Sequence, residues 1–270
     1  MSRFTIQNPG APALEIRELS KHYTTVEAVK RISLRVERGE IYGFLGPNGA
    51  GKTTTIRTLV GLLRPTGGEV VLGGYGLHED PVAAKGIVGF IPDRPYIYEK
   101  LTGEEFLRFI AGLYGVYPGE EEELGERIAD LLLFFQLEEW RDELVESYSH
   151  GMKQRLVMAS ALLHDPEIII VDEPLVGLDP KGARLLKDLF QQKVAEGGAI
   201  FMSTHTLAVA EELCDRIAII NDGEIIAEGT LEELRTVAGM GGDKGARLEA
   251  VFLKLTADED MEELIKVLKV

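Results

Sequence analysis

A glycine-rich run, GPNGAGKT, follows the apolar stretch IYGFL and precedes an expected helix. Glycines let backbone N–H groups approach phosphate oxygens, and a helix start adds the positive end of its dipole. At this spacing Lys52 neutralises charge on β- and γ-phosphates, and the Thr53 hydroxyl ligates magnesium. The run therefore predicts a nucleotide-phosphate site, and a turn that merely connects strand and helix is the alternative. The residues we expect to cradle the phosphates are Gly46, Pro47, Asn48, Gly49, Ala50, Gly51, Lys52, Thr53 and Thr54.

Two neighbouring carboxylates end a second apolar stretch, EIIIVDEP. Asp172 and Glu173 stand where ligands bind in open α/β sheets, at the carboxyl end of a strand. A phosphate site needs a carboxylate for its metal and a group that activates water. We expect Asp172 to hold magnesium and Glu173 to act as the general base. Two acids that only cap a strand end are the alternative, which a neighbouring phosphate loop disfavours.

The elements that must position these groups alternate between strands and helices. EIIIVDEP and GGAIFMSTH are short apolar runs, separated by the helical run PKGARLLKDLFQQKVAEG. This alternation indicates an α/β fold with a parallel sheet covered on both faces. Earlier in the chain, ALEIRELSKHY and RISLRVERGEIYGFLG show strand-like alternation. Asn221-Asp222-Gly223 predicts a hairpin turn between two further strands.

A helix-rich stretch interrupts the strands at about residues 95–155. Thr102 and Glu105 have the spacing of a capping box, and a second helical run extends from about Glu120 to Gln136. Near the C-terminus, Thr230 and Glu233 begin one more helix in the same way. GMGGDKG, residues 239–245, predicts a flexible joint before a short helical extension, and residues 1–12 read as a loose leader.

Composition limits the classes of function. The chain has 270 residues, of which 45% are hydrophobic, so it can bury a sizeable core. Its formal net charge of -16 disfavours nucleic acid as a partner, although an average charge leaves a local basic groove open. The single cysteine, Cys214, reads as a buried helix residue in a reducing compartment. No apolar run approaches the roughly 18 to 20 residues that span a bilayer, and we expect no signal peptide.

A further motif connects these features to a known family. SHGMKQR, residues 149–155, matches the signature S-G-G-Q-x-Q-R of the ATP-binding cassette (ABC) family, except that His150 replaces a glycine and Met152 a glutamine. From about Leu14 to Ala238 the chain resembles ATP-binding subunits of ABC transporters. The Tyr-Ser-x-Gly-Met-Lys-Gln form resembles ABC-2-type exporters of the multidrug or sodium-efflux kind.

The resemblance implies roles for further residues. Tyr23 matches the aromatic residue that stacks on adenine, Asp179 the acidic loop after the catalytic glutamate, and His205 the switch histidine that faces the γ-phosphate. Ser149, Gly151 and Met152 stand at positions of the signature that contacts ATP from a second copy, and Met152 is one of its two departures. Each single match has an alternative: Tyr23 as a packed strand aromatic, Asp179 as a helix N-cap, and His205 as a hydrogen-bonded residue at a strand end.

Asp93 departs from the family pattern, which usually has a glutamine at this position. Its side chain is shorter and ionised, so it changes the local electrostatics while it can still face magnesium directly or through water. We therefore expect Asp93 to be a metal-facing residue. We also expect the loop around it to contact a membrane partner, to which YIYEKLTGEEFLRF offers aromatic and apolar residues that are alternatively core.

As a whole, the resemblance implies a P-loop NTPase core at residues 1–238, with a mostly parallel sheet flanked by helices. An N-terminal antiparallel β subdomain and the helical insertion at about 95–155 complete it, and residues 239–270 form the joint and extension. ATP and Mg²⁺ are the implied cofactors, and the implied partners are a second cassette and a transmembrane permease on the inner face of the membrane. A soluble cassette that acts on ribosomes or nucleic acid, and a nucleotide switch with little hydrolysis, are the alternatives.

Overall fold

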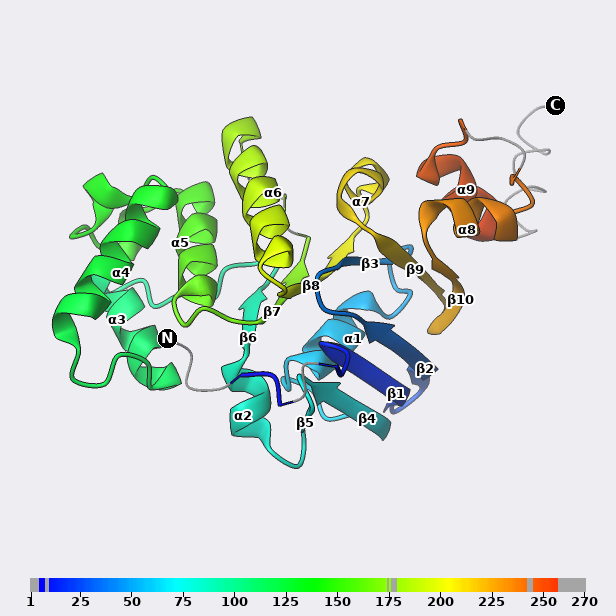
Figure 1. The fold of residues 1–270 in the computed structure, drawn as a ribbon, viewed down its shortest axis with the longest axis horizontal. Coiled ribbons are helices and arrows are strands. Elements are labelled where there is room, and N and C mark those ends of the chain that lie inside the picture. The colour runs from blue at the N-terminus through cyan, green and yellow to red at the C-terminus, as the bar shows by residue number, and fades with distance from the viewer. Residues whose placement is uncertain (1–4, 8–9, 174, 176–178, 242–244, 257–270) are drawn as a thin grey trace.

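The computed structural model describes residues 5–7, 10–173, 175, 179–241 and 245–256 (Figure 1). A six-stranded sheet with the order β10-β9-β3-β8-β7-β6 forms its centre. From β9 to β6 all neighbouring strands are parallel, and β10 is antiparallel to β9. Every residue of the three middle strands is buried, which explains their unbroken apolar sequences. The strands are β3 (Ile41–Leu45), β6 (Val88–Ile91), β7 (Ile168–Asp172), β8 (Ala199–Thr204), β9 (Arg216–Asn221) and β10 (Glu224–Gly229).

A second sheet of four antiparallel strands has the order β2-β1-β4-β5. Helix α1 (Lys52–Leu59) shares one hydrophobic cluster with both sheets: its Ile56 and Leu59 are fully buried beside Phe44 of β3 and Val70 of β4. The phosphate loop therefore leads into a helix that is fixed from two sides. The strands are β1 (Leu14–Tyr23), β2 (Val26–Val36), β4 (Gly67–Leu72) and β5 (Tyr75–Gly76), and α2 (Pro81–Gly86) follows them.

The helix-rich insertion lies between β6 and β7 and forms a group of helices at one end of the molecule, on the left in Figure 1. It contains α3 (Gly103–Tyr114), α4 (Glu121–Phe134), the short 3₁₀ turns Glu138–Trp140 and Val145–Ser147, and α5 (His150–Leu162). The expected capping box is present, because Glu105 N donates to Thr102 Oγ1 at 3.2 Å and Thr102 N donates to Glu105 Oε2 at 2.9 Å. The prediction of an α/β fold with an antiparallel β subdomain and a helical insertion is confirmed.

In the described part of the chain, β7 is followed by four further helices: α6 (Pro180–Ala195), α7 (Leu207–Leu213), α8 (Leu231–Val237) and α9 (Leu248–Thr256). The expected hairpin joins β9 and β10, with Asp222 at φ 47° and Gly223 at φ 80°. Beyond the glycine-rich segment, of which 242–244 lie outside the described residues, α9 packs against α7 and α8. Leu248 and Val251 of α9 are fully buried there. The described part of the C-terminal extension is thus a docked helix.

Two expectations of the sequence need correction. The leader is not wholly loose, because Ile6 is buried and its backbone N donates to Glu167 Oε1 at 3.1 Å. The physical reason is that burial of an apolar side chain against the core lowers the free energy of the chain relative to exposure to water. Cys214 does not lie within a helix but directly after α7. Its thiol faces Gly43 of β3, and burial raises its pKa to about 12.

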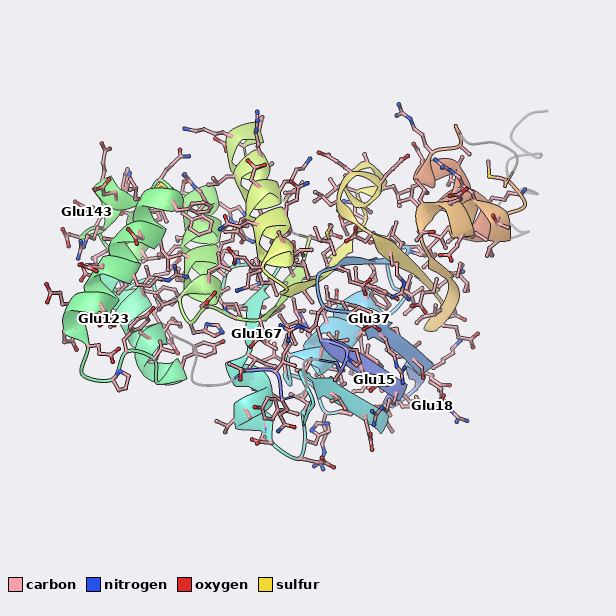
Figure 2. All side chains as sticks on the ribbon, viewed as in Figure 1. Glu15, Glu18, Glu37, Glu123, Glu143 and Glu167 are labelled. Atoms are coloured by element: carbon pink, nitrogen blue, oxygen red, sulfur yellow. The ribbon has the colours of Figure 1, made fainter. Side chains whose placement is uncertain are left out.

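The acidic residues are spread over the whole molecule. Figure 2 labels Glu123 and Glu143 in the helical insertion and Glu15 and Glu18 on the antiparallel sheet, at the other end. Acidic side chains therefore occur at both ends of the described part of the molecule. Among the residues that the structure describes, no helix is long and apolar enough to cross a membrane.

Candidate active site

The register of the parallel sheet brings the expected site residues to one edge. Leu45, the last residue before the phosphate loop, pairs with Thr204, and Ser203 pairs with Asp172. Consequently the phosphate loop, the segment after β8 and the acidic pair leave three adjacent strands at the same level. β6 ends at Ile91 beside β7, and its continuation carries Asp93 to the same edge.

A cavity of about 410 Å³ lies at this edge. It brings together most of the residues that the sequence predicts for phosphate, metal and water. On one wall are the phosphate-loop residues Asn48, Gly49, Gly51, Lys52, Thr53 and Thr54. The charged and titratable groups on the other walls are Asp93, Asp172, Glu173 and His205.

The phosphate loop has a shape that only glycine permits at two positions. Gly51 has φ 109°, and a Cβ there would lie 2.5 Å from the carbonyl oxygen of Ala28. A Cβ on Gly46 would lie 2.3 Å from the carbonyl oxygen of Ile220. Helix α1 begins without a side-chain cap and without an acidic residue in its first turn. Its first N–H groups therefore remain available to an anion in the cavity.

Lys52 is buried at the base of this loop. Its Nζ donates to the carbonyl oxygen of Gly46 at 2.6 Å and to that of Pro47 at 3.0 Å. Burial lowers the pKa of Lys52, whereas the negative charges of Glu173 and Asp172 act in the opposite direction. A phosphate oxygen is a stronger partner than a carbonyl oxygen, because the hydrogen bond is then charged on both sides. The Lys52 ammonium thus lies at the cavity, and its hydrogen bonds to two carbonyl oxygens can be replaced by bonds to phosphate oxygens.

Asp172 is also buried, and Ser203 Oγ donates a hydrogen bond to its Oδ1. Burial raises the pKa of this carboxyl, and the like charges of Glu173 and Asp93 add to the effect. A crowded, desolvated carboxylate of this kind gains from a cation. In the described part of the chain no three His, Cys, Asp or Glu side chains gather closely enough to hold a metal by themselves. The carboxylates of Asp172 and Asp93 at the cavity fit Mg²⁺, which is usually bound by one or two carboxylates together with substrate phosphates and water.

Glu173 is held in one orientation by the segment after β8. His205 Nδ1 lies 2.7 Å from its Oε1, to which the backbone N of His205 also donates at 2.9 Å, and Thr204 Oγ1 donates to its Oε2 at 3.1 Å. The residue adopts a left-handed backbone conformation, φ 53°, which costs a non-glycine residue roughly 1–3 kcal/mol. Its backbone N donates to the carbonyl oxygen of Ser203 at 3.0 Å, which helps to fix this conformation.

Other predicted residues do not line this cavity. Tyr23 is 46% exposed at the hairpin between β1 and β2, with Lys21 Nζ 5.3 Å from its ring centre. Asp179 caps helix α6 by accepting a hydrogen bond from Gly182 N at 2.7 Å. The alternative interpretation of Asp179 as an N-cap therefore describes a contact that it makes.

The signature residues lie at the start of α5, also outside the cavity. Ser149 is the N-cap, and its Oγ accepts from Met152 N at 3.3 Å. The Met152 side chain is buried in the core of the helical insertion, so it does not offer a surface to a nucleotide. A contact of Met152 with ATP stays a prediction, and it would be made by the backbone.

Three supporting residues escaped the sequence analysis. Ser203 and Thr204 orient the acidic pair, and Ala28 of β2 closes one wall of the cavity. Ser203 and Thr204 directly precede His205. Pairing the apolar run EIIIVDEP in parallel with GGAIFMSTH would have placed them beside the acidic pair. Ala28 has no chemical signal in the sequence, because it contributes through the β1–β2 hairpin of the other sheet.

A larger, mostly apolar groove of about 950 Å³ adjoins the cavity. Thr53, Asp93 and Asp172 line both, so the groove and the cavity share a wall. Two of its aromatic side chains are strongly exposed: Tyr96 by 79% and Tyr98 by 60%. The loop that carries Asp93 is tied to α5, because Gln154 Nε2 donates to the carbonyl oxygen of Pro92 at 3.1 Å.

Known proteins share this sequence and fold. Residues 29–176 match the family model described as ABC transporter. The chain is 37% identical over 246 residues to the ABC-type transporter ATP-binding protein EcsA of Bacillus subtilis, covering 91% of this chain and 97% of EcsA. It is 39% identical over 215 residues to the SkfA peptide export ATP-binding protein SkfE of Bacillus subtilis, covering 80% and 88%.

Two solved structures are similar to the whole cassette. One is described as an ATP-binding subunit of an ABC transporter, with a TM-score of 0.84 and 37% identity over 90% of this chain and 99% of the other. The second is the ATP-binding cassette MJ0796, a dimer in a post-hydrolysis state bound to ADP and Pi. It has a TM-score of 0.73 and 26% identity over 81% of this chain and 98% of the other.

Proposed function

Because this chain belongs to the ABC transporter family and is an ATP-hydrolysing cassette, we propose that it powers a separate transmembrane permease that exports its substrate. The cavity in which Lys52 and Thr53 face Asp172 and Glu173 is the observation that carries this proposal. It combines a phosphate cradle, a metal ligand set and a base in one space, which are the parts that phosphoryl transfer to water requires.

In this proposal the phosphate loop binds ATP through the backbone from Gly46 to Thr54. Lys52 exchanges its two carbonyl partners for β- and γ-phosphate oxygens. The Thr53 hydroxyl and the Asp172 carboxylate hold Mg²⁺, with Asp93 facing it directly or through water. Magnesium, when bound, offsets the negative charge of the phosphates and of the crowded carboxylates.

Glu173 is the proposed general base, because its carboxylate is fixed beside the cavity by His205 and Thr204. It takes a proton from the attacking water as the water oxygen bonds to the γ-phosphorus, while the bond from that phosphorus to the β–γ bridging oxygen breaks and ADP leaves with the electron pair. His205 then donates to a γ-phosphate oxygen, where charge develops. For this contact one imidazole nitrogen, Nδ1 or Nε2, donates its proton to a hydrogen bond with the phosphate. The backbone N–H of His205 continues to donate to Glu173 and keeps the carboxylate in place.

The residues outside the cavity serve a second cassette in this proposal. The start of α5, with Ser149, Gly151 and the backbone of Met152, closes on the ATP of the partner copy. Asp179 lies at the same interface, and the exposed ring of Tyr23 stacks on adenine. The dimeric state of MJ0796 with ADP and Pi supports this arrangement by similarity.

The apolar groove is the proposed docking site for a helix of the permease. Its exposed aromatic residues favour an apolar occupant, and its shared wall at Asp93 connects that occupant to the metal and phosphate site. A push in the groove then moves Asp93, and closure at the phosphates moves the groove. The chain is thereby held at the inner face of the membrane through its partner.

The names of the relatives favour transport over an ATPase that acts on ribosomes or nucleic acid. SkfE is named for peptide export, which supports the outward direction. We also propose that residues 1–238 are the ATPase domain, with its helical subdomain at about 95–155, and that 239–270 are an extension of it.

The hydrolytic part is tested with the purified chain. Phosphate release from ATP is measured with and without Mg²⁺, for the natural chain and for Lys52→Ala. We expect release that depends on magnesium and is lost in the variant. Absence of ATP binding at millimolar ATP with Mg²⁺ would overturn the proposal.

The docking part is tested with two variants of equally exposed residues. Tyr98 in the groove and Leu133 on α4 outside it are both 60% exposed. Tagged natural chain, Tyr98→Glu and Leu133→Glu are purified from detergent-solubilised membranes of the source organism. We expect a protein with several hydrophobic spans of roughly 20 residues to accompany the natural chain and Leu133→Glu, and to be lost with Tyr98→Glu. Equal recovery with all three chains contradicts docking in the groove.

A further inference from the structure

The C-terminal helix α9 reaches the nucleotide edge of the cassette. A small pocket of about 230 Å³ is lined by Gly46, Pro47 and Asn48 of the phosphate loop, by Thr204, His205 and Leu207, and by Phe252 of α9. More than 200 residues separate Phe252 from the loop in sequence. Phe252 nevertheless forms one wall of this pocket. The other walls are the phosphate loop and residues 204–207, which we call the histidine segment.

Helix α9 is fixed firmly enough to define the position of Phe252. Leu248 and Val251 are fully buried in a cluster with Leu45, the last residue before the phosphate loop. Leu248 N donates to Glu211 Oε2 of α7 at 3.3 Å, and Arg235 Nε of α8 donates to the carbonyl oxygen of Ala246 at 2.7 Å. These contacts hold α9 against both neighbouring helices, on the upper right of Figure 1.

His205 is held by Glu173 through its Nδ1 and its backbone N, but the helix that follows it gives it little further support. Its side chain is 63% exposed, and the helix that follows it, α7, has seven residues and no side-chain cap at Thr206. So short a helix is marginal by itself and depends on tertiary packing. Leu207, the first residue of α7, is half-buried and packs in the same cluster as Phe252. α9 thus supports the segment that carries the histidine.

From this arrangement we infer that Phe252 is a positioning residue for ATP hydrolysis: it lines one pocket with the phosphate loop and the start of α7, and its packing against the same cluster as Leu207 sets where His205 meets the γ-phosphate. This inference rests on the proposed function of His205. Phe252 touches no reacting atom. It acts through Leu207 and the backbone of the histidine segment, so its loss affects turnover and leaves the phosphate cradle of Lys52 and Thr53 intact.

Phe252→Ala, Phe252→Leu and Leu253→Ala test this inference. Leu253 is the matched control, because it lies one position along the same helix but is 60% exposed and outside the pocket. We expect Phe252→Ala to lower kcat by roughly ten- to one-hundredfold, as a small displacement of a catalytic group does. KM for ATP and the affinity for a fluorescent ATP analogue should stay within about twofold of the natural chain. Phe252→Leu should recover most of the activity, and Leu253→Ala should behave like the natural chain.

A double-mutant cycle with His205→Ala separates positioning from a general loss of structure. If Phe252 acts through His205, Phe252→Ala lowers single-turnover hydrolysis much less in the His205→Ala background than alone. Equal effects in both backgrounds would overturn the inference, as would an unchanged kcat or a rise in KM as the main effect. These outcomes leave the hydrolytic part of the proposed function standing, because that part fails only if the natural chain itself does not bind or hydrolyse ATP.

Discussion

The imidazole Nδ1 of His205 lies 2.7 Å from Oε1 of Glu173, and the two side chains come from the ends of adjacent parallel strands. The proposed base and the proposed phosphate-facing histidine are therefore one hydrogen-bonded pair. If His205 turns to the γ-phosphate as we propose, the phosphate competes with the carboxylate for the imidazole. Glu173 then loses one hydrogen-bond donor and becomes a stronger base.

Glu173→Gln keeps a side chain of the same size but is a poor base: its single amide oxygen can accept from His205, and its amide nitrogen can donate to Thr204 Oγ1. We expect ATP binding and ATP-dependent dimerisation to persist, whereas kcat falls roughly 10²- to 10⁴-fold. Phosphate release and light scattering with ATP measure the two properties. Glu123→Gln, an exposed change on α4 (Figure 2), is the control and should leave both unchanged. Parental turnover in Glu173→Gln would show that another group is the base.

Lys52→Ala should abolish tight ATP binding without unfolding the chain. Burial already disfavours the charged form of Lys52 and lowers its pKa, so removal of the ammonium relieves a desolvation cost. We expect the affinity for ATP to fall more than tenfold, because a charge-assisted contact is lost, while Tm without nucleotide changes little. Isothermal calorimetry and thermal unfolding measure these effects. A clear fall in Tm without nucleotide would indicate that Lys52 has a structural role.

Asp93→Ala and Asp93→Gln separate the charge of this residue from its polarity. We expect Asp93→Ala to raise the Mg²⁺ concentration needed for half-maximal hydrolysis by several-fold, because a metal-facing oxygen is lost. Asp93→Gln should retain much of the natural magnesium dependence, since an amide oxygen can still face the metal. Titration of hydrolysis with Mg²⁺ at fixed ATP gives both values. Natural magnesium dependence in Asp93→Ala argues against a role at the metal.

His164 predicts how stability depends on pH. The ring is buried, stacked on Tyr114, and its Nε2 lies 3.1 Å from the carbonyl oxygen of Val88. Burial lowers the pKa of His164 from its ordinary 6.5 to about 4. Between these values the unfolded chain binds a proton that the folded chain does not bind. The free energy of unfolding therefore falls as pH falls from about 6.5 toward 4, by up to roughly 3 kcal/mol from this group.

Urea unfolding at several pH values between 7 and 4 tests this dependence. His164→Gln keeps a donor for the Val88 carbonyl and does not titrate, so its stability should decline less steeply. His78→Gln, a change of an exposed histidine, should follow the natural chain. Parallel pH curves for all three chains would show that His164 does not control this region of pH.

The sequence predicted those parts of the site that follow from short motifs. The phosphate loop requires glycines at a fixed spacing, and the acidic pair ends an apolar strand, so both carry a local signal. The α/β fold was also predictable, because buried parallel strands have unbroken apolar runs between helices.

The remaining parts depend on contacts between distant segments, which a single sequence does not display. Ala28 and Phe252 reach the site from the second sheet and from the C-terminal helix, and neither residue type suggests chemistry. Met152 stands at a signature position of the family, which suggested a contact with ATP. Its side chain packs inward because the start of α5 directs it to the core. The burial of Ile6 is likewise a property of the sheet beneath it.

The hydrogen bond from Gln154 to the carbonyl of Pro92 has a mechanical consequence. Gln154 is buried, and within the described residues its Oε1 has no hydrogen-bond partner, so the amide is anchored on one side alone. A tilt of α5 that broke this anchor would leave the whole amide without compensation, which is costly. This hydrogen bond therefore couples the start of α5 to the loop that carries Asp93, because a movement of either one that breaks it leaves a buried amide unpaired.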